Sequence, residues 1–389
     1  MDPAQPTSTA IAPGLPSDPA TAARRTPLTE QISAPARLPA VPYRGARTIP
    51  AFTGAPTGAA AELHALLANT GMFDLGWRSF LLCKGEDRVR WLNGMVTNSV
   101  TGLARNAGCY AFVLNAQGRI QGDATIYLRG DALWLQTDAA QVETLSQFLD
   151  RYIIMDDVEL RCDSEWTAIG IAGPGAAGTL ATVGLSVEGL APIQLREDSW
   201  EGVPVCAVAA RGPLVPRYEL WVPAARAIDL WQALSRTGAQ PCGSDAVEQL
   251  RILEGVPAYS VDITNRELPQ ETAQMHALHF SKGCYLGQEI VERIRSRGNV
   301  HRAFSGFLLQ PGEGAPDPAP KSALLADGQP AGELTSIARI KIPETGERLV
   351  ALGYIRREAL DRGSKLTCGE AAATAMPLPF HCKRDAPNP

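Results

Sequence analysis

The sequence is most distinctive at residues 281–289, which read Ser281-Lys282-Gly283-Cys284-Tyr285-Leu286-Gly287-Gln288-Glu289. Two glycines bracket a thiol that follows a lysine, and glycine permits close backbone approach or a positive φ. A nearby ammonium group favours thiolate over thiol, so Cys284 and Lys282 form a candidate reactive centre. Residues 288–295 are predicted to form a helix directly after this loop. The alternative is that Cys284 is a small buried hydrophobic residue in an ordinary turn.

The composition is that of a folded protein with more than one domain. The chain has 389 residues, of which 45% are hydrophobic and 20% are charged, and one ordinary core does not extend over that length. The formal net charge is -5 and the pI is about 5.7. No overall positive field is therefore available to hold RNA or DNA.

Cysteine usage and targeting signals favour the cytoplasm. The eight cysteines include no C-x-x-C pair, which predicts free thiols in a reducing compartment. No run of about 18 apolar residues is present to span a membrane. Asp2 and Asp18 precede the first arginine, Arg24, whereas a mitochondrial presequence is rich in arginine and poor in acids. We therefore expect a bacterial-type cytoplasmic protein rather than one of the mitochondrial matrix.

Changes in composition and in hydrophobic pattern divide the chain into successive parts. Residues 1–57 hold 11 of the 30 prolines and show no hydrophobic period, so they are predicted to form a disordered leader. Strand and helix patterns then alternate through residues 58–300, in two α+β subdomains at 58–165 and 166–300. Short strands with Gly and Pro turns predict a β-barrel over residues 301–375, followed by a tail at 376–389.

A β-hairpin is the clearest single element. Residues 110–114 and 120–128 are strand-like, and the segment that joins them is Asn115-Ala116-Gln117-Gly118. Its glycine can supply the positive φ of a tight turn. Tyr110 and Asp123 lie on the two strands, so both side chains could reach one pocket. The alternative is that Asp123 is an ordinary aspartate of a hairpin, with its side chain in solvent.

Two histidines precede the loop at residues 281–289. His276 and His279 lie three residues apart, and Cys284 follows five residues later. These three side chains could be metal ligands, but the sequence has no second cysteine cluster to complete a metal site. No metal is therefore predicted.

A local basic run follows the loop. Arg293, Arg297 and Arg302 surround a Gly-Asn pair within an acidic chain. Arginine forks match carboxylates and phosphates, so the run could capture the glutamate tail of a folate or a nucleic-acid backbone. Ordinary solvation of such a run is an equally weighted alternative.

The loop sequence K-G-C-Y-x-G-Q-E resembles the hallmark of the YgfZ-type folate-binding proteins, which are related to the glycine-cleavage T-protein, an aminomethyltransferase. Seven residues carry it: Lys282, Gly283, Cys284, Tyr285, Gly287, Gln288 and Glu289. The resemblance continues through residues 71–75, 115–123, 251–257 and 268–271, where the chain reads Leu268-Pro269-Gln270-Glu271.

The resemblance implies an α+β fold with the three-domain, ring-like arrangement of the T-protein and a C-terminal β-barrel. It implies binding of tetrahydrofolate or a one-carbon derivative, by residues that match the family's pocket: Tyr110, Asp123, Asn115, Arg251 and Tyr259. It also implies support for the assembly or repair of iron-sulfur proteins, with an indirect effect on methylthiolation of tRNA. Cys284, Lys282 and Asp123 are the candidate catalytic residues.

Two departures from the T-protein pattern keep other functions open. The T-protein has two adjacent acids in the hairpin, whereas this chain has Gly122-Asp123, and Leu253 stands near the place of a pterin-binding glutamate. The first hypothesis is thus a folate-dependent accessory factor with iron-sulfur clients or assembly proteins as partners. The second is an aminomethyltransferase or demethylase that uses Asp123. The third is direct tRNA binding through residues 293–302, which the net charge disfavours.

Overall fold

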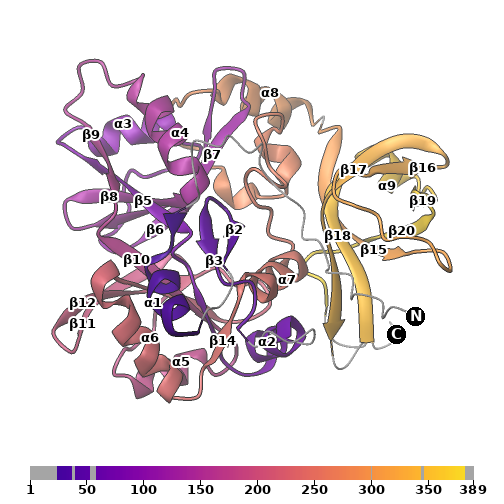
Figure 1. The fold of residues 1–389 in the computed structure, drawn as a ribbon. Coiled ribbons are helices and arrows are strands. Elements are labelled where there is room, and N and C mark those ends of the chain that lie inside the picture. The colour runs from indigo at the N-terminus through magenta and orange to yellow at the C-terminus, as the bar shows by residue number, and fades with distance from the viewer. Residues whose placement is uncertain (1–23, 37–39, 53–57, 299, 343–345, 382–389) are drawn as a thin grey trace.

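The computed structural model describes residues 24–36, 40–52, 58–298, 300–342 and 346–381. Within them, two mixed α/β parts and a barrel are arranged around a central region that contains α7 (Ser244–Glu254) (Figure 1). Helix α7 contacts strands of both the second sheet and the barrel. The α+β class that the sequence predicts is confirmed.

The first α/β part is built on a five-stranded antiparallel sheet with the strand order β6-β7-β8-β5-β9. Its strands are β5 (Arg78–Lys84), β6 (Gly108–Leu114), β7 (Ile120–Arg129), β8 (Ala132–Asp138) and β9 (Glu159–Asp163). Helices α3 (Arg88–Met95) and α4 (Ala139–Asp150) pack on it. The predicted hairpin is confirmed as β6 and β7, and Gly118 in its turn has φ +71°.

The second α/β part has a six-stranded sheet with the order β11-β12-β13-β10-β4-β14. Its strands are β4 (Gly71–Asp74), β10 (Trp166–Ala172), β11 (Gln194–Trp200), β12 (Val203–Ala210), β13 (Arg217–Pro223) and β14 (Gln240–Cys242). Its helices are α2 (Gly58–Ala68), α5 (Ala176–Thr182), η1 (Ala224–Arg226), α6 (Ala227–Arg236) and α7.

A connecting region and the predicted barrel complete the described chain. The connection holds two short 3-10 helices, η2 (Pro269–Thr272) and η3 (Met275–Ala277), and then α8 (Gln288–Arg297). The barrel is closed, in the order β15-β18-β17-β16-β19-β20. Its elements are β15 (Arg302–Gln310), β16 (Ala323–Ala326), β17 (Gln329–Ile342), β18 (Gly346–Arg356), α9 (Arg357–Asp361), β19 (Leu366–Cys368) and β20 (Ala371–Met376).

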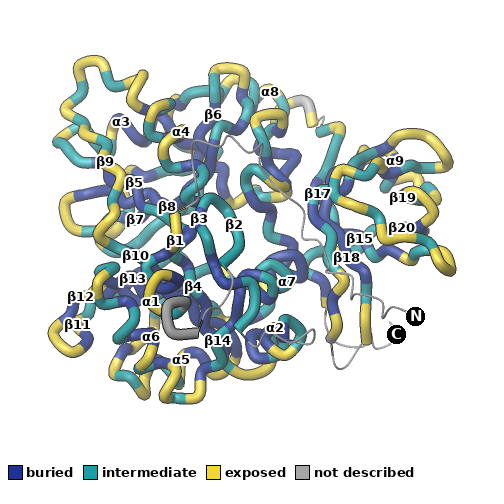
Figure 2. The backbone as a smooth tube through the Cα atoms, viewed as in Figure 1, coloured by how far each residue is buried: buried dark blue, intermediate teal, exposed yellow. Residues whose placement is uncertain are grey.

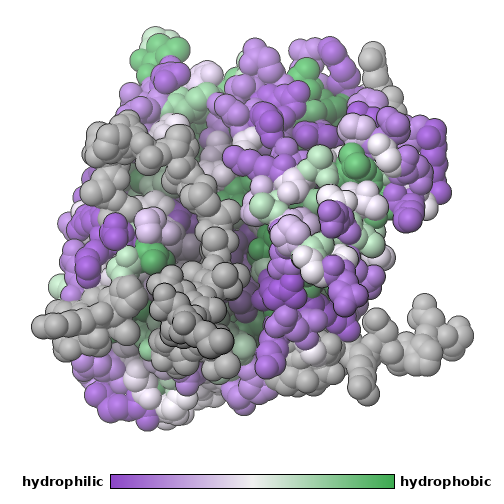
Figure 3. All heavy atoms as spheres, turned by 45° about the vertical axis from the view of Figure 1, so that its right-hand side comes forward, coloured by the Kyte–Doolittle hydropathy of each residue, from purple (hydrophilic) through white to green (hydrophobic). Residues whose placement is uncertain are grey.

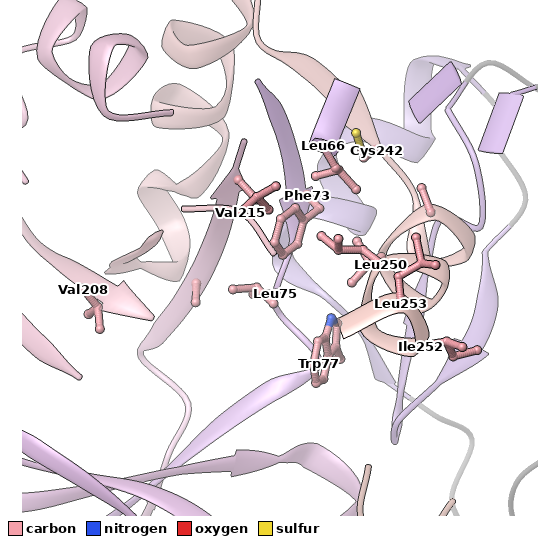
Figure 4. Close-up of a cluster of buried hydrophobic side chains, with 14 of the residues drawn as sticks. Leu66, Phe73, Leu75, Trp77, Val208, Val215, Cys242, Leu250, Ile252 and Leu253 are labelled. Atoms are coloured by element: carbon pink, nitrogen blue, oxygen red, sulfur yellow. The ribbon is translucent and has the colours of Figure 1, made fainter. Parts of the chain in front are cut away.

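The largest core joins the second sheet to α2 and α7. Leu66 from α2, Phe73 from β4 and Leu250 from α7 are buried and converge in Figure 4. Gly170 on β10 makes room for the Phe73 ring, because a Cβ there would lie 2.1 Å from Cε2 of that ring. The strands are mostly buried in Figure 2, while the exposed stretches fall mainly on loops and helix surfaces.

The prediction of a disordered leader at residues 1–57 is wrong for residues 24–36 and 40–52. These residues form β1 (Arg24–Arg25), α1 (Pro27–Ala36), β2 (Val41–Tyr43) and β3 (Ala46–Thr48). Leu28 and Ile49 are buried, and Arg44 pairs with Asp138 at the end of β8. The segment has too few apolar residues for a core of its own, but it adds them to the core of the body. The remaining leader residues lie outside the described ranges.

The predicted boundary between 58–165 and 166–300 also differs from the structure. Strand β4 pairs with β10 and β14, so residues 71–74 belong to the second sheet although they precede the first in sequence. At the other end, η3 packs on β6 of the first sheet, and η2 packs on β15 of the barrel. Pairing between distant segments, which periodicity does not reveal, sets these boundaries.

Among the residues that are coloured in Figure 3, hydrophilic side chains predominate, and apolar side chains appear there in small separate areas. None of the helices in the described ranges is long and apolar enough to cross a membrane. All seven cysteines in these ranges are free thiols.

Candidate functional site

A buried carboxyl group on the hairpin forms the centre of the candidate site. Asp123 on β7 accepts a hydrogen bond from Tyr110 Oη of β6 at 2.6 Å, on its Oδ2 atom. Its Oδ1 accepts from Gln141 Nε2 of α4 at 2.9 Å, and its backbone N–H donates to Gln141 Oε1 at 3.1 Å. The carboxyl group is thus held from two sides in one orientation, on regular elements of the sheet.

The surroundings of Asp123 raise its pKa above the ordinary value of an aspartate. Burial raises the pKa of Asp123 most, the nearby Asp138 carboxylate raises it further, and the hydrogen bonds from Tyr110 and Gln141 lower it in part. Arg78 binds Asp138 at 2.6 Å, and Arg44 binds it at 3.3 Å. Burial therefore outweighs the hydrogen bonds and the nearby Arg78 cation, and a raised pKa suits a carboxyl that holds and releases a proton.

A neutral histidine and a guanidinium group lie beside Tyr110. The His276 ring stacks on the Tyr110 ring with the centroids 5.4 Å apart and an angle of 27° between the planes. Burial, and then the Arg211 guanidinium, lower the pKa of His276 to about 4, so the ring is uncharged at pH 7. Tyr259 adjoins the same region, since its Oη donates to the Gln121 carbonyl of β7 at 2.8 Å.

Lys282 of the loop is held by backbone carbonyls rather than by the thiol of Cys284. Its Nζ donates to the carbonyls of Asn93, Val96 and Asn98 at 2.6, 2.7 and 2.7 Å. Burial lowers the pKa of Lys282 to about 8. The ammonium group thereby caps the C-terminal end of α3 and the turn that follows this helix.

Cys284 itself is exposed on the loop. The thiol that Lys282 influences is Cys109: burial raises the pKa of Cys109 to about 12, and Lys282 opposes that shift. Among the described contacts of Lys282, none involves Cys284, so the predicted activation of this thiol by the lysine lacks the expected contact.

The loop positions α8 against the hairpin. Gly287 begins the helix with φ +80°, and a Cβ there would lie 2.5 Å from the Asn115 carbonyl oxygen, so only glycine fits. Tyr285 is buried, and its backbone N–H donates to Gln288 Oε1 at 3.3 Å. Glu289 forms a surface pair with Arg293 at 3.2 Å. Gly287 and Tyr285 thus hold the start of α8 against the hairpin, and the predicted helix at 288–295 is confirmed.

This arrangement is shared with proteins of a known family. The family defined by the GCVT N-terminal domain matches residues 39–282, which is more than half of the chain. The chain belongs to the GCVT N-terminal domain family.

Relatives and a solved structure extend the likeness beyond that domain. The "Aminomethyltransferase" of Rubrobacter xylanophilus is 28% identical over 369 residues, which cover 93% of this chain and 95% of that protein. The "Putative transferase At1g60990, chloroplastic" of Arabidopsis thaliana is 25% identical over 321 residues, covering 81% and 72%. The glycine cleavage system aminomethyltransferase T of Bartonella henselae has a TM-score of 0.81 at 20% identity, covering 93% of this chain and 99% of that chain. The T-protein fold that the sequence predicts is thus confirmed.

Two residues that were expected to line the pocket of this GCVT-domain protein have other partners. Asn115 Oδ1 accepts from the backbone N–H groups of Gln117 and Arg119 at 3.0 and 2.9 Å, so the side chain shapes the hairpin turn. Arg251 is buried, and all five of its guanidinium N–H donors are used within the protein. These bonds use all five donors of the guanidinium group, so none remains for direct contact with a folate in this structure.

The predicted anion-binding run is largely neutralised. Arg302 forms two hydrogen bonds of 3.1 Å with Glu271 and lies 3.5 Å from Glu267, and Arg293 pairs with Glu289. The side chain of Arg297 lies outside the described part of the structure. Capture of a folate tail or of tRNA by this run is therefore not favoured.

Gln141 is not among the site residues that the sequence predicts, and His276 is predicted there only as a possible metal ligand. In the described ranges no group of three or more His, Cys, Asp and Glu side chains is placed to hold a metal ion. His276 stacks on Tyr110, and His279 Nδ1 accepts from the backbone N–H of Ser281 at 3.3 Å. Gln141 lies on α4, and only the packing of α4 on β7 brings it to Asp123.

The raised pKa of Asp123 predicts a pH-dependent gain in stability for Asp123→Asn. The folded state prefers the protonated carboxyl, so the contribution of Asp123 to stability is largest below its unfolded pKa of about 3.9 and is lost as the pH rises through the folded value. A neutral asparagine avoids this loss. We expect the variant to melt at or above the wild-type temperature at pH 8, and the difference to vanish near pH 3.5. Thermal unfolding across this range checks the result, and a marked loss of stability at pH 8 would contradict it.

Proposed function

We propose that this GCVT-domain protein binds a reduced folate with its pterin ring at Asp123 and Tyr110. The observation that supports this most is the buried carboxyl group, fixed by Tyr110 and Gln141, at the centre of a fold shared with aminomethyltransferases. A pterin presents amino and ring N–H donors, and the remaining lone pairs of the Asp123 carboxylate can accept from them. Tyr259 and His276 flank this position and contribute aromatic surface.

The binding proposal is tested by calorimetric titration with 5-formyltetrahydrofolate. Asp123→Asn and Tyr110→Phe are each expected to weaken binding by about 10-fold or more, because each removes a charged or polar group from a buried site. Asp131→Asn, an exposed aspartate in the turn after β7, and Tyr218→Phe on β13 are the matched controls and should bind as the wild type does. Equal affinity of Asp123→Asn, Tyr110→Phe and the wild type would reject this pocket.

The second element of the proposal is a role in supporting iron-sulfur proteins, with Cys284 as the exposed thiol that acts on a client. The resemblance of residues 282–289 to the YgfZ-type motif suggests this role, and the exposure of Cys284 suits it. The thiol lies on a loop that Lys282 and Gly287 hold in place, so it can meet a partner while the loop stays folded.

Complementation of a strain that lacks the gene tests this role. Cys284→Ala is expected to leave an iron-sulfur enzyme of that strain with the low activity of the deletion, whereas Cys162→Ala should restore it fully. Cys162 is the matched control because it is the other exposed cysteine among the described residues. Full restoration by Cys284→Ala would assign the loop a purely structural function.

Aminomethyl transfer is a second candidate, favoured by the raised pKa of Asp123, which suits a carboxyl that exchanges a proton with a reacting amine. Gly122 in place of a second acid argues against it. Incubation with tetrahydrofolate and an aminomethyl donor distinguishes the two functions. Turnover that forms methylenetetrahydrofolate and ammonia, and that is lost in Asp123→Asn, would establish the transferase.

A further inference from the structure

Arg211 carries a positive charge that is not neutralised within the described part of the chain. It follows the last residue of β12, and its side chain is exposed. That side chain forms no ion pair or hydrogen bond with another residue that the structure describes. In contrast, Arg293 and Arg302 of the predicted anion-binding run are paired with glutamates. The guanidinium group of Arg211 therefore remains available to a negatively charged ligand.

The pairing of the backbone brings Arg211 to the same end of the structure as Tyr110. Ala107, directly before β6, pairs antiparallel with Gln194, and Gln194 pairs antiparallel with Ala209 of β12. The chain at Ala107 and at Ala209 therefore runs in the same direction, on either side of one intervening strand, about 10 Å apart. Tyr110 lies three residues beyond Ala107, and Arg211 lies two residues beyond Ala209. A long arginine side chain can span that separation.

His276 lies close to both of these residues. Its ring stacks on the ring of Tyr110 with the centroids 5.4 Å apart, and the charge of Arg211 contributes to the lowered pKa of His276. Partial burial lowers the pKa of Arg211 as well, which is the response of a cation that has lost some water without gaining a counter-ion. A bound anion at this position would stabilise Arg211.

We propose that Arg211 binds a carboxylate of the glutamate tail of the folate, so that the protein prefers folates to pterins that lack a tail. This inference rests on the proposed folate site at Asp123. The site offers the Asp123 carboxyl group, then the rings of Tyr110 and His276, and then the cation of Arg211. A folate has the complementary groups in the same order: the N–H groups of the pterin, the aminobenzoyl ring and the carboxylates of glutamate. Arginine is well suited to the last of these, because its fork of N–H donors matches a carboxylate.

The experiment is a calorimetric titration of the full chain with two probes under anaerobic conditions. Tetrahydrofolate carries the tail, and 6-methyltetrahydropterin lacks it. Arg211→Met is expected to weaken binding of tetrahydrofolate by about 10-fold and to leave binding of 6-methyltetrahydropterin unchanged. Arg236→Met on α6 is the matched control, because Arg236 is also exposed and forms no ion pair or hydrogen bond through its side chain with a described residue. It should bind both probes as the wild type does.

Salt provides the second arm. Added salt should weaken the binding of tetrahydrofolate to the wild type more than to Arg211→Met, because an exposed charge pair is screened. The inference is overturned if Arg211→Met binds tetrahydrofolate as the wild type does, or if it weakens both probes equally. Asp123→Asn distinguishes the two proposals, since it should weaken both probes. A loss of both in Asp123→Asn with Arg211→Met unchanged would retain the folate site and reject the role of Arg211. If neither probe binds to the wild type, both proposals fail.

Discussion

Arg251→Met is expected to lower the free energy of unfolding by about 3–5 kcal/mol, the usual cost of removing one partner from a buried ion pair. Arg251 binds Asp262 and Glu248 at 2.6 Å each, and it donates to Ser336 Oγ of the barrel strand β17 at 2.7 Å. The Asp262 side chain is completely buried. Methionine fills a similar volume but leaves that carboxylate without its cation and removes the bond to the barrel.

Chemical denaturation of Arg251→Met and of Arg226→Met measures this difference. Arg226 also pairs with an aspartate, Asp229 at 2.6 Å, but both side chains are more than 40% exposed. A pair of this kind contributes about 0–1 kcal/mol, so the control should unfold close to the wild type. If both variants lose the same small amount of stability, the link that Arg251 makes between α7 and the barrel is unimportant.

Lys282→Met should destabilise the protein by about 2–4 kcal/mol, because hydrogen bonds from a charged donor are strong and their loss leaves carbonyls unpaired. Three carbonyls lose their ammonium donor at once, those of Asn93, Val96 and Asn98. Cys284→Ala, two positions along the same loop, should change stability by less than about 0.5 kcal/mol, because the side chain is exposed.

Thermal and urea unfolding of these two variants separates the roles of the motif. The expected outcome is a large shift for Lys282→Met together with unchanged stability for Cys284→Ala. A reactive centre in which Lys282 serves only the thiol would give the opposite signature, with stability intact in both variants and the alkylation rate of Cys284 lowered in Lys282→Met.

Local patterns in the sequence predict the parts of the fold that depend on neighbouring residues. Gly118 in the hairpin turn and Gly287 at the start of α8 have positive φ values that their positions require, and both elements form as expected. The closed barrel follows in the same way from short strands and turn residues. Tyr110 and Asp123 are brought together because the hairpin places them on adjacent strands.

The errors arise where distant segments meet. Prolines at residues 24–52 suggest disorder, yet Leu28 and Ala46 enter cores made by other parts of the chain. The position of Arg251 in the sequence predicts a folate ligand, but in the fold its N–H groups donate to Asp262 and to Ser336 of β17. Gln141 could not be found from its own surroundings, since the contact with Asp123 depends on the packing of α4.

The location of a bound folate decides whether Asp123 and Tyr110 form the folate site. We would determine a crystal structure of the protein with 5-formyltetrahydrofolate and measure the distance from the Asp123 carboxylate to the nearest pterin nitrogen. We expect a hydrogen bond of about 2.7–3.2 Å there, with the pterin beside Tyr110. A folate that lies elsewhere, with Asp123 still bonded only to Tyr110 and Gln141, would contradict it.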